Sequence, residues 1–405
     1  MNTTTTAPGL EAPVGMPVAA RAALRMLDQL RDGTLTVHLP DGSARRFGSG
    51  ELHAAIHLAS WQPLVRALRS GDIGFAESYL DGEWTTPSLP DLLVLLVRNR
   101  RALEQAVYGS FWGRLAHRLQ HLLNRNSRTG SRRNIQAHYD LGNSFYREWL
   151  DPSMNYSSAW FEGKPDAPLQ PAQDAKVRRA LSLANVQPGD RVLEIGCGWG
   201  ALAEMGAASF GAHVTGVTLS TEQLAFAQQR LAQAGLADRA DLRLQDYRDI
   251  ADAPFDAICS IEMLEAVGRE WWPTYFSNVR RLLKPGGHAC IQTIVIADGL
   301  WDRYIRSSDF IQQYVFPGGC LPCPREFRRA AAAAGLEVVD EFAFGADYAE
   351  TLRRWRAQVH ARRSAILAQG FDERFMRLWD FYLAYCEAAF AEGNTDVVQY
   401  TLRRP

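Results

Sequence analysis

Short apolar runs alternate with longer segments of helical periodicity between residues 169 and 294. The apolar runs predict strands at 191–195, 213–219, 241–244, 255–261 and 288–294, and the periodic segments predict helices at 175–184, 201–209, 221–234 and 271–283, with a Lys-Pro-Gly-Gly turn at 284–287. Strands that alternate with helices require right-handed crossovers and form a mainly parallel sheet. We therefore predict a doubly wound α/β domain whose ligand lies over the carboxyl ends of its strands.

The residues before this region follow a different pattern. Residues 19–99 mix short helical segments with one hairpin at 34–43, which turns at Asp41-Gly42. Residues 98–133 combine arginines with regularly spaced apolar positions and predict an amphipathic helix, whose basic face can lie on anionic lipid headgroups or simply face solvent. The predicted organisation is a disordered lead at 1–18, a smaller, mostly helical accessory domain at 19–123, a linker at 124–133 and the α/β domain at 134–405.

Composition narrows the class of protein. A chain of 405 residues with 47% hydrophobic residues can bury a large core, and a formal net charge of −1 argues against nucleic-acid binding by bulk charge. The longest aliphatic run, 92–97, is far shorter than the roughly 20 residues that span a bilayer. The cysteines are scattered, and only Cys320 and Cys323 lie close together, as two incidental thiols in a turn. These features predict a cytoplasmic protein that is soluble or rests on a membrane surface.

A glycine turn follows the first predicted strand of the α/β domain. Glu194 lies in this strand, and Gly196, Gly198 and Gly200 come after it at alternate positions. A dinucleotide-binding turn would have the spacing G-x-G-x-x-G, with an acid about 20 residues later, and neither feature is present. S-adenosylmethionine (SAM) fits this turn better because it has no phosphates to bind. The alternative is a tight strand-to-helix turn that binds no ligand.

Two further strand ends carry polar residues. Gln245, Asp246 and Tyr247 follow the third predicted strand, where Asp246 can accept a hydrogen bond from an adenine amine and Tyr247 can stack on the ring. Glu262 and Glu265 follow the next strand and are predicted at the floor of the pocket. The alternative for either glutamate is a helix N-terminal position that the helix dipole favours.

Several longer motifs are more specific. They occupy residues 139–143, 154–158, 193–200, 217–220, 245–248, 316–322, 344–348 and 381–386. From about residue 134 to its end the chain resembles the cyclopropane-fatty-acyl-phospholipid synthases, a family of SAM-dependent methyltransferases that includes the mycolic acid cyclopropane synthases. The resemblance implies a Rossmann-like methyltransferase fold. It also implies transfer of the methyl(ene) carbon of SAM to the cis double bond of an unsaturated phospholipid acyl chain, at the inner face of the cell membrane.

The resemblance also implies a set of residues around SAM. They are Tyr156, Ser157, Gly196 and Gly198 at the methionine part, Thr218, Leu219 and Gln223 at the ribose, and Asp246, Tyr247 and Ile261 at the adenine. In this family the alkene itself takes the methyl group, and a carbocation results. Loss of a proton from the new methyl group with ring closure then gives a cyclopropane. Water in such a pocket would trap the cation, so the pocket must be apolar and hold one weak base.

The base that the family uses is a bound bicarbonate. Its ligands map here onto Glu265, Gln292, the backbone of Ile294 and Tyr348. The chain departs from the family pattern at Gln292, which replaces a histidine and cannot titrate near neutral pH, and at Ser158, which replaces a cysteine in many relatives. Glu262 is unusual at its position and is a candidate substitute base.

Three alternatives stay open. The same cation can end as a methylene- or methyl-branched chain without ring closure, or the protein can be a lipid-binding protein that has lost catalysis. Methylation of an oxygen or nitrogen nucleophile is disfavoured because it needs a general base beside a polar substrate. Cys386 matches a cysteine proposed as catalytic in the family, but its aromatic helix indicates packing instead. A homodimer is left open.

Overall fold

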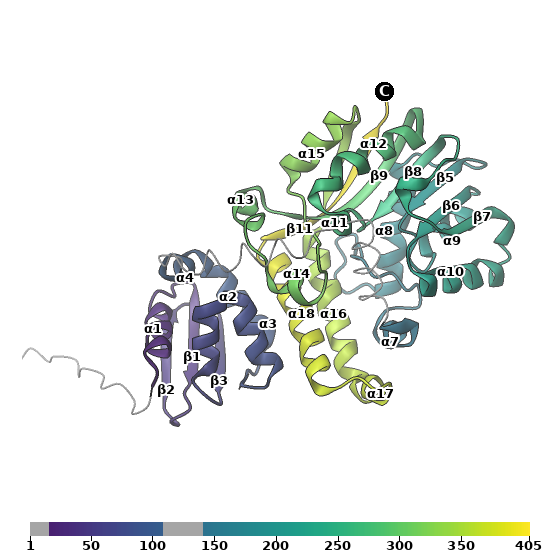
Figure 1. Ribbon diagram of the computed structural model, residues 1–405. Coiled ribbons are helices and arrows are strands. Elements are labelled where there is room, and N and C mark those ends of the chain that lie inside the picture. Colours follow the sequence, from purple (N-terminus) through teal and green to yellow (C-terminus); the bar gives the residue numbers. More distant parts are fainter. Residues whose placement is uncertain (1–15, 108–140) are drawn as a thin grey trace, which may run out of the picture. The chain divides into compact units, whose positions relative to one another are not determined.

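The computed structural model describes residues 16–107 and 141–405, apart from the side chains of 104–107, and it divides into two compact units (Figure 1). The units comprise residues 1–115 and 116–405, so the division falls between the described ranges. The predicted linker at 124–133, nearly all of the predicted lead, and most of the predicted basic helix lie outside the described residues. The two units are described separately below.

The first unit contains a four-stranded sheet as well as the expected helices. Its elements are α1 (Val18–Leu27), β1 (Gly33–His38), β2 (Ala44–Ser49), β3 (His53–Leu58), α2 (Gln62–Leu80), β4 (Trp84–Thr85), α3 (Leu89–Arg98) and α4 (Arg100–Val107). The predicted hairpin is confirmed, since β1 and β2 pair antiparallel around Gly42, whose φ is +86°. The aliphatic run 92–97 belongs to α3, where Leu92, Leu93 and Leu95 are buried. Among the described residues, no helix combines the length and hydropathy that crossing a bilayer requires.

The second unit contains the predicted doubly wound sheet. Its first elements are α7 (Gly142–Trp149), α8 (Leu169–Leu183), β5 (Arg191–Ile195), α9 (Ala201–Ser209), β6 (His213–Thr218), α10 (Thr221–Gln233), β7 (Ala240–Leu244), β8 (Phe255–Ile261), α11 (Leu264–Val267), α12 (Trp272–Leu282) and β9 (Leu283–Ile296). The remaining elements are α13 (Trp301–Tyr304), α14 (Phe310–Tyr314), α15 (Pro324–Ala333), β10 (Glu337–Ala343), α16 (Gly345–Ala361), α17 (Arg363–Ala368), α18 (Glu373–Ala391) and β11 (Thr395–Arg403). Every strand predicted between residues 191 and 294 is confirmed.

The strand order is β10-β11-β9-β8-β5-β6-β7. Strands β5 to β9 pair in parallel, and β10 and β11 add an antiparallel edge. From β5 the chain runs outward through β6 and β7 and then returns to place β8 on the other side of β5. The crevice between β5 and β8 is therefore the switch point of the sheet, where a ligand is expected to bind.

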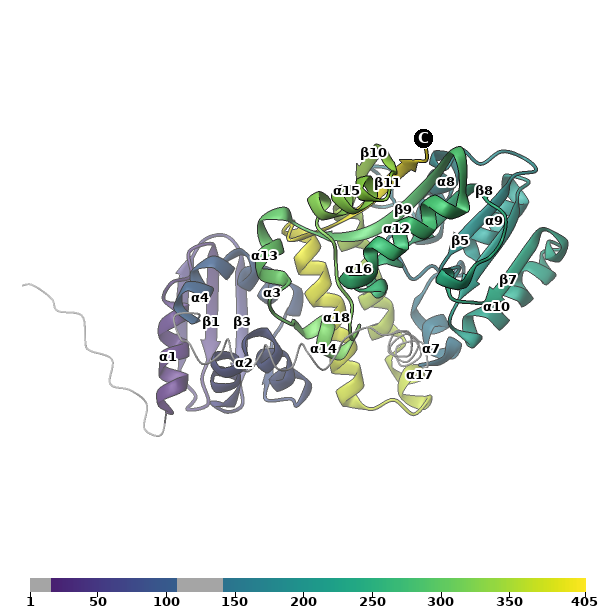
Figure 2. The ribbon, with the colours of Figure 1, turned by 45° about the horizontal axis from the view of Figure 1, so that its top comes forward.

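Helices cover both faces of this sheet. One core contains residues of α11, α12, α13 and α15, and the other contains residues of α8, α9 and α10. Figure 2 shows α12 and α15 together over the first of these faces. Successive strand residues serve opposite cores, as when Ile258 faces the first and Cys259 the second. This burial on both faces explains why the strands are continuous apolar runs in the sequence.

The structure places the predicted turn at 284–287 and the two neighbouring cysteines. The predicted turn at 284–287 is included in β9, whose pairing with β8 is irregular between Phe255 and Ala257. Gly287 allows this close approach, because a Cβ there would lie 2.8 Å from the carbonyl oxygen of Asp256. Cys320 and Cys323 are both unpaired thiols, as predicted, and Cys323 caps the N-terminus of α15.

Candidate active site

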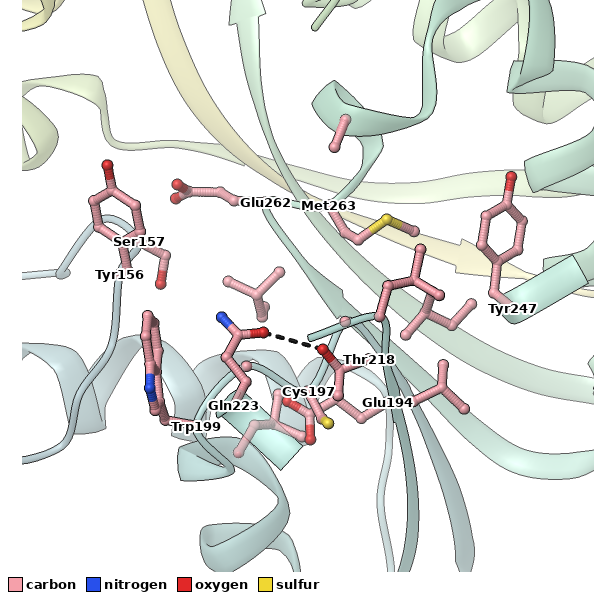
Figure 3. Close-up of a pocket in the computed structure, with 18 of the residues that line it drawn as sticks. Tyr156, Ser157, Glu194, Cys197, Trp199, Thr218, Gln223, Tyr247, Glu262 and Met263 are labelled. Atoms are coloured by element: carbon pink, nitrogen blue, oxygen red, sulfur yellow. Dashed lines mark hydrogen bonds between the residues drawn. The ribbon is translucent and has the colours of Figure 1, made fainter. Parts of the chain in front are cut away.

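A pocket opens at the carboxyl ends of β5, β6, β7 and β8 (Figure 3). Its lining includes twelve of the residues predicted around SAM: Tyr156, Ser157, Glu194, Gly196, Gly198, Thr218, Leu219, Gln223, Gln245, Asp246, Tyr247 and Ile261. These residues come from the loop before α8, from four strand ends and, for Gln223, from the first turn of α10. The structure therefore brings together the positions that the sequence predicted.

The glycine turn forms one wall of the pocket. Gly196 has a φ of +86°, and a Cβ there would lie 2.8 Å from the Cγ of Met263. Gly198 has a φ of +49°, and a Cβ there would meet no atom within 4 Å. The amides of Gly196 and Cys197 both donate to the carbonyl oxygen of Val217 at 3.0 Å. Both amides are therefore hydrogen-bonded to β6 and are not available to bind a phosphate.

Gly200 has a different role from the one predicted. It is the N-cap of α9, with a φ of +84°, and it does not belong to the pocket lining. A Cβ at Gly200 would lie 2.9 Å from the Cβ of Ala227 in α10. The third glycine thus allows α9 and α10 to pack closely, which is a contact that the local spacing could not reveal.

Glu194 is an acceptor at the base of the pocket. Its side chain is buried, and within the described ranges its Oε2 has no hydrogen-bond partner. Burial raises the pKa of Glu194 well above its ordinary value, while the charge of Lys176 lowers it. A ligand ammonium group would supply the missing partner.

Gln223 presents a donor to the pocket. The Oγ1 of Thr218 donates to the Oε1 of Gln223 at 3.0 Å, as the dashed line in Figure 3 marks. The same helix start is capped by the Oγ of Ser220, which accepts from the backbone amide of Gln223 at 3.2 Å. Because the amide oxygen is held by Thr218, the NH₂ group of Gln223 is turned to the cavity, where it can bind a ribose hydroxyl.

The residues that follow β7 form another wall of the pocket. The Oδ1 of Asp246 accepts from the backbone amide and from the Nε of Arg248, both at 2.9 Å, and its Oδ2 accepts from the Nη2 of Arg248 at 2.5 Å, so its carboxylate is fixed in place. Burial raises the pKa of the Tyr247 hydroxyl to about 12. Gln245 also lines the pocket, and its Nε2 is engaged because it donates to the carbonyl oxygen of Asp249 at 3.0 Å.

Glu262 projects from the end of β8 toward Tyr156 and Ser157 (Figure 3) and lines the same pocket. Its carboxylate accepts three hydrogen bonds. The backbone amide of Ser158 and the Nε2 of Gln292 donate to Oε1 at 2.9 and 2.8 Å, and the hydroxyl of Tyr348 donates to Oε2 at 2.7 Å. Burial raises the pKa of Glu262, although these hydrogen bonds and the charge of Lys176 oppose the shift.

Glu265 lies in α11, one turn after Glu262. Its Oε1 accepts from the backbone amide of Ile294, whereas Oε2 has no partner among the described residues. Burial, and then the charge of Glu262, raise the pKa of Glu265 to about 8. At neutral pH Glu265 is therefore mainly protonated, and Glu262 is the carboxylate with the donors that favour its charge.

The hydrogen bonds to Glu262 and Glu265 decide whether a bicarbonate can bind as predicted. The donors that the resemblance assigns to it are Gln292, the amide of Ile294 and Tyr348. All three already donate to the side chains of Glu262 or Glu265. An additional anion would also meet the charge of Glu262 in a buried setting. The described residues therefore do not fit a bound bicarbonate.

The two remaining predicted residues contribute little to the pocket. Ser158 is buried and donates its hydroxyl to the carbonyl oxygen of Ala159 at 2.9 Å, so only its backbone amide serves Glu262. Cys386 is not part of the pocket lining. Burial raises the pKa of its thiol, so it is not a thiolate. This placement agrees with packing rather than catalysis.

Sequence reasoning missed Lys176 and Gln399. Lys176 of α8 is buried, and its Nζ donates to the Oγ of Ser157 at 2.5 Å and to the Oδ1 of Asn155 at 3.4 Å. Burial lowers the pKa of Lys176 to about 8. Gln399 of β11 donates to the Oε1 of Gln292 at 3.0 Å. A lone lysine among the apolar positions of a predicted helix was the one available signal, because the pairing of β11 with β9 is not local.

An aromatic cluster backs the pocket wall at Tyr156. The ring of Tyr156 lies 5.4 Å from those of Tyr146 and Trp149 and 5.5 Å from that of Trp355, between centroids. Its hydroxyl is 2.8 Å from that of Tyr382. The ring of Tyr156, which lines the pocket, is therefore backed by further aromatic rings, and an aromatic face favours a cationic species.

Comparison with known proteins gives consistent matches. The family model described as mycolic acid cyclopropane synthetase matches residues 126–400. The chain is 40% identical over 383 residues to the tuberculostearic acid methyltransferase UfaA1 of Mycobacterium tuberculosis, covering 92% of this chain and 84% of that protein. It is 35% identical over 356 residues to the cyclopropane-fatty-acyl-phospholipid synthase of Escherichia coli K12, covering 88% and 89%.

A solved structure is consistent with these sequence matches. The mycolic acid cyclopropane synthase CmaA1 complexed with SAH and CTAB superposes with a TM-score of 0.63 at 33% identity, over 67% of this chain and 97% of that one.

Proposed function

Because the chain belongs to the mycolic acid cyclopropane synthetase family of SAM-dependent methyltransferases, we propose that it methylates the cis double bond of an unsaturated acyl chain carried by a phospholipid. The observation that carries this proposal is Glu262, a half-buried carboxylate in the lining of the cofactor pocket that points toward Tyr156. An alkene needs no protein nucleophile. It needs an aromatic surface for the cation and one base for the proton, and Tyr156 and Glu262 are the groups we propose for these two roles.

The chain's own residues bind and orient SAM, which supplies the methyl group when bound. Glu194 accepts from the ammonium group, and the NH₂ of Gln223 donates to the ribose. Asp246 and Tyr247 bound the adenine. Tyr156 and Ser157 lie over the methionine part, and the hydrogen bond from Lys176 fixes Ser157 in place. This set of contacts leaves the sulfonium side of the pocket open toward Glu262.

Two products can follow from the same cation. If the proton of the new methyl group is removed at once, ring closure gives the cyclopropane, which is the product we propose. If a hydride first shifts to the cationic carbon, loss of the same methyl proton gives a methylene branch. The branched product is the alternative, because Gln292 stands where the family has a histidine and because UfaA1 is named a methyltransferase rather than a cyclopropane synthase.

The substrate also defines where the protein must work. An acyl chain of a membrane phospholipid can be reached only from the membrane surface, so we propose peripheral contact with the inner face of the cell membrane from the cytoplasm. The basic sequence at 98–133 is the proposed contact segment. No nucleic acid is expected as a partner, and a homodimer stays a prediction.

The proposal is tested by incubating the protein with methyl-labelled SAM and liposomes that contain oleoyl phospholipid. We expect labelled fatty acid after saponification, and mass spectrometry of the methyl esters separates ring from branch. Absence of labelled fatty acid with every lipid composition, although calorimetry shows SAM binding, would instead favour a lipid-binding protein without catalysis.

A further inference from the structure

We infer that the carboxylate of Glu262 is a covalently attached equivalent of the anion that the family is expected to bind, and that its Oε2 is the base that takes the proton from the methylated acyl chain. This inference rests on the proposed function. It separates this chain from an enzyme that needs bicarbonate, because the base is part of the protein.

The first argument is the set of donors. The amide of Ser158, the Nε2 of Gln292 and the hydroxyl of Tyr348 converge on one carboxylate at 2.7 to 2.9 Å. They come from three separate segments, which are the loop before α8, strand β9 and helix α16. A carboxylate and a bicarbonate share the same planar O–C–O group, so donors placed for one suit the other.

The second argument is the backbone. Glu262 has a φ of +48°, in the left-handed region that favours glycine and is costly for a glutamate. Its amide donates to the carbonyl oxygen of Gln292 at 2.8 Å, so the conformation is fixed by the sheet. A strained residue that persists beside a pocket indicates that its side chain has a function there.

The third argument is the free acceptor position. An ionised carboxylate has about four lone-pair sites. Two hydrogen bonds use the sites of Oε1, and the bond from Tyr348 uses one site of Oε2. The remaining site belongs to Oε2, on a residue that lines the pocket. Oε2 is therefore the atom that can still accept a proton.

The step balances without another reactant. The alkene carbon forms a bond to the methyl group as the sulfur–methyl bond breaks, and the sulfur keeps its electron pair. One C–H bond of the new methyl group then breaks, and its electrons close the ring, or form the methylene double bond after a hydride shift. The proton passes to Oε2 of Glu262.

Burial raises the pKa of Glu262, and its hydrogen bonds and the charge of Lys176 oppose this shift and favour the ionised form. Lys176 is a buried cation on its side of the pocket, and Glu265 is the neighbouring acid. Tyr348 meets Glu262 as a neutral donor, because burial raises the pKa of its hydroxyl well above the ordinary value. Since Glu265 holds its proton up to about pH 8, Glu262 has no charged acid beside it at neutral pH.

The test uses Glu262→Gly in buffer freed of carbon dioxide. Glycine adopts the positive φ without strain, so the variant should fold, and it leaves the three donors facing an empty space. Added bicarbonate should then bind there and raise the Tm of Glu262→Gly with increasing concentration, compared with sodium chloride at equal ionic strength. Wild type should show no such rise.

A matched control is Glu162→Gly. Glu162 is also a glutamate at positive φ, +54°, but it is exposed in a turn and does not belong to the pocket lining. It should relieve the same backbone strain without creating an anion site. A bicarbonate-dependent rise in Tm that is confined to Glu262→Gly therefore reports on the three donors.

Turnover gives the second readout. Wild type should methylate lipid equally well with and without bicarbonate. Glu262→Gly should lose roughly 10²–10⁴-fold, the range for a missing general base, and recover at least tenfold with bicarbonate. Glu262→Gln keeps the side-chain volume but cannot accept the proton, so it should lose turnover while calorimetry shows unchanged SAM affinity.

Three results would overturn the inference: loss of wild-type turnover when carbon dioxide is removed, full turnover of Glu262→Gln, or no Tm response of Glu262→Gly beyond that of Glu162→Gly. A wild-type protein that labels no lipid would overturn the proposed function instead. The Tm comparison would still decide whether Glu262 occupies an anion site.

Discussion

Gln399 donates from its Nε2 to the Oε1 of Gln292 at 3.0 Å, and this contact decides which end of Gln292 faces Glu262. With its oxygen held by Gln399, Gln292 must present its NH₂ group to the carboxylate. Gln399 is itself held, because its Nε2 also donates to the carbonyl oxygen of Lys176 and its Oε1 accepts from Arg179. A residue of β11, the strand paired with β9, thus orients a donor at the base.

This relationship makes Gln292→His an informative variant. A neutral histidine can accept from Gln399 at one ring nitrogen and donate to Glu262 at the other, so we expect a folded, active enzyme. A protonated histidine would form an ion pair with Glu262 and weaken it as a base. Slower proton removal gives the hydride shift more time, so the branched product should increase at acidic pH.

Mass spectrometry of the product esters between about pH 6 and 8 measures this ratio, around the ordinary histidine pKa of about 6.5. Wild type is the control, since glutamine does not titrate. A product ratio that is the same in both proteins at every pH would show that basicity at Glu262 does not select the product.

Glu265→Gln should change how stability depends on pH. Glu265 has a pKa of about 8 in the folded protein against an ordinary value of 4.5, so the folded state holds the proton more tightly. Its stabilising contribution is complete below about pH 4.5 and is lost as pH rises through 8. Glutamine copies the protonated form, so the variant should gain at least about 1 kcal/mol relative to wild type between pH 5 and 9.

Urea unfolding of both proteins at several pH values gives this difference in the free energy of unfolding. The comparison is made against wild type at each pH, so titration of the groups that do not interact with Glu265 cancels. Parallel stability curves for the two proteins would mean that Glu265 is already ionised at neutral pH.

Gly196→Val should abolish SAM binding. The new Cβ would lie 2.8 Å from the Cγ of Met263, and the valine side chain would extend into the pocket. Gly189→Val is the matched control, because Gly189 has nearly the same φ, +87°, but is exposed with no atom within 4 Å of the added Cβ. The control should lose about 1–2 kcal/mol of stability and keep its SAM affinity.

Calorimetric titration with SAM separates the two effects. Equal loss of affinity in both variants would mean that backbone strain, rather than the blocked pocket, prevents binding.

Local pattern predicted the sheet because each buried strand is an uninterrupted apolar run, and it predicted the pocket because parallel strands end at the same edge. It could not predict the role of Gly200, which depends on packing against Ala227 in another helix. The hydrogen-bond donors to Glu262 are also distant in sequence, since Ser158 and Tyr348 lie 104 and 86 residues away. Lys176 was missed because lysine in a helix is usually solvent-exposed.

The buried Lys176 leads to a prediction about charge in the pocket. Its pKa of about 8 means that the ammonium group loses its proton near that pH, which removes one positive charge from the side of the pocket that also holds Glu194 and Glu262. SAM carries a sulfonium charge that SAH lacks. Raising the pH from 7 to 9 should therefore strengthen SAM binding relative to SAH by severalfold, because the pocket becomes more negative. The amino and carboxylate groups are common to both ligands, so their titration cancels in the ratio of the two Kd values. Lys176→Met keeps the length of the side chain without the charge, so its ratio should change less with pH than that of wild type, and the remaining change reports on Glu265, which also titrates near pH 8. A wild-type ratio that changes no more than that of Lys176→Met would show that Lys176 stays in one protonation state across this range.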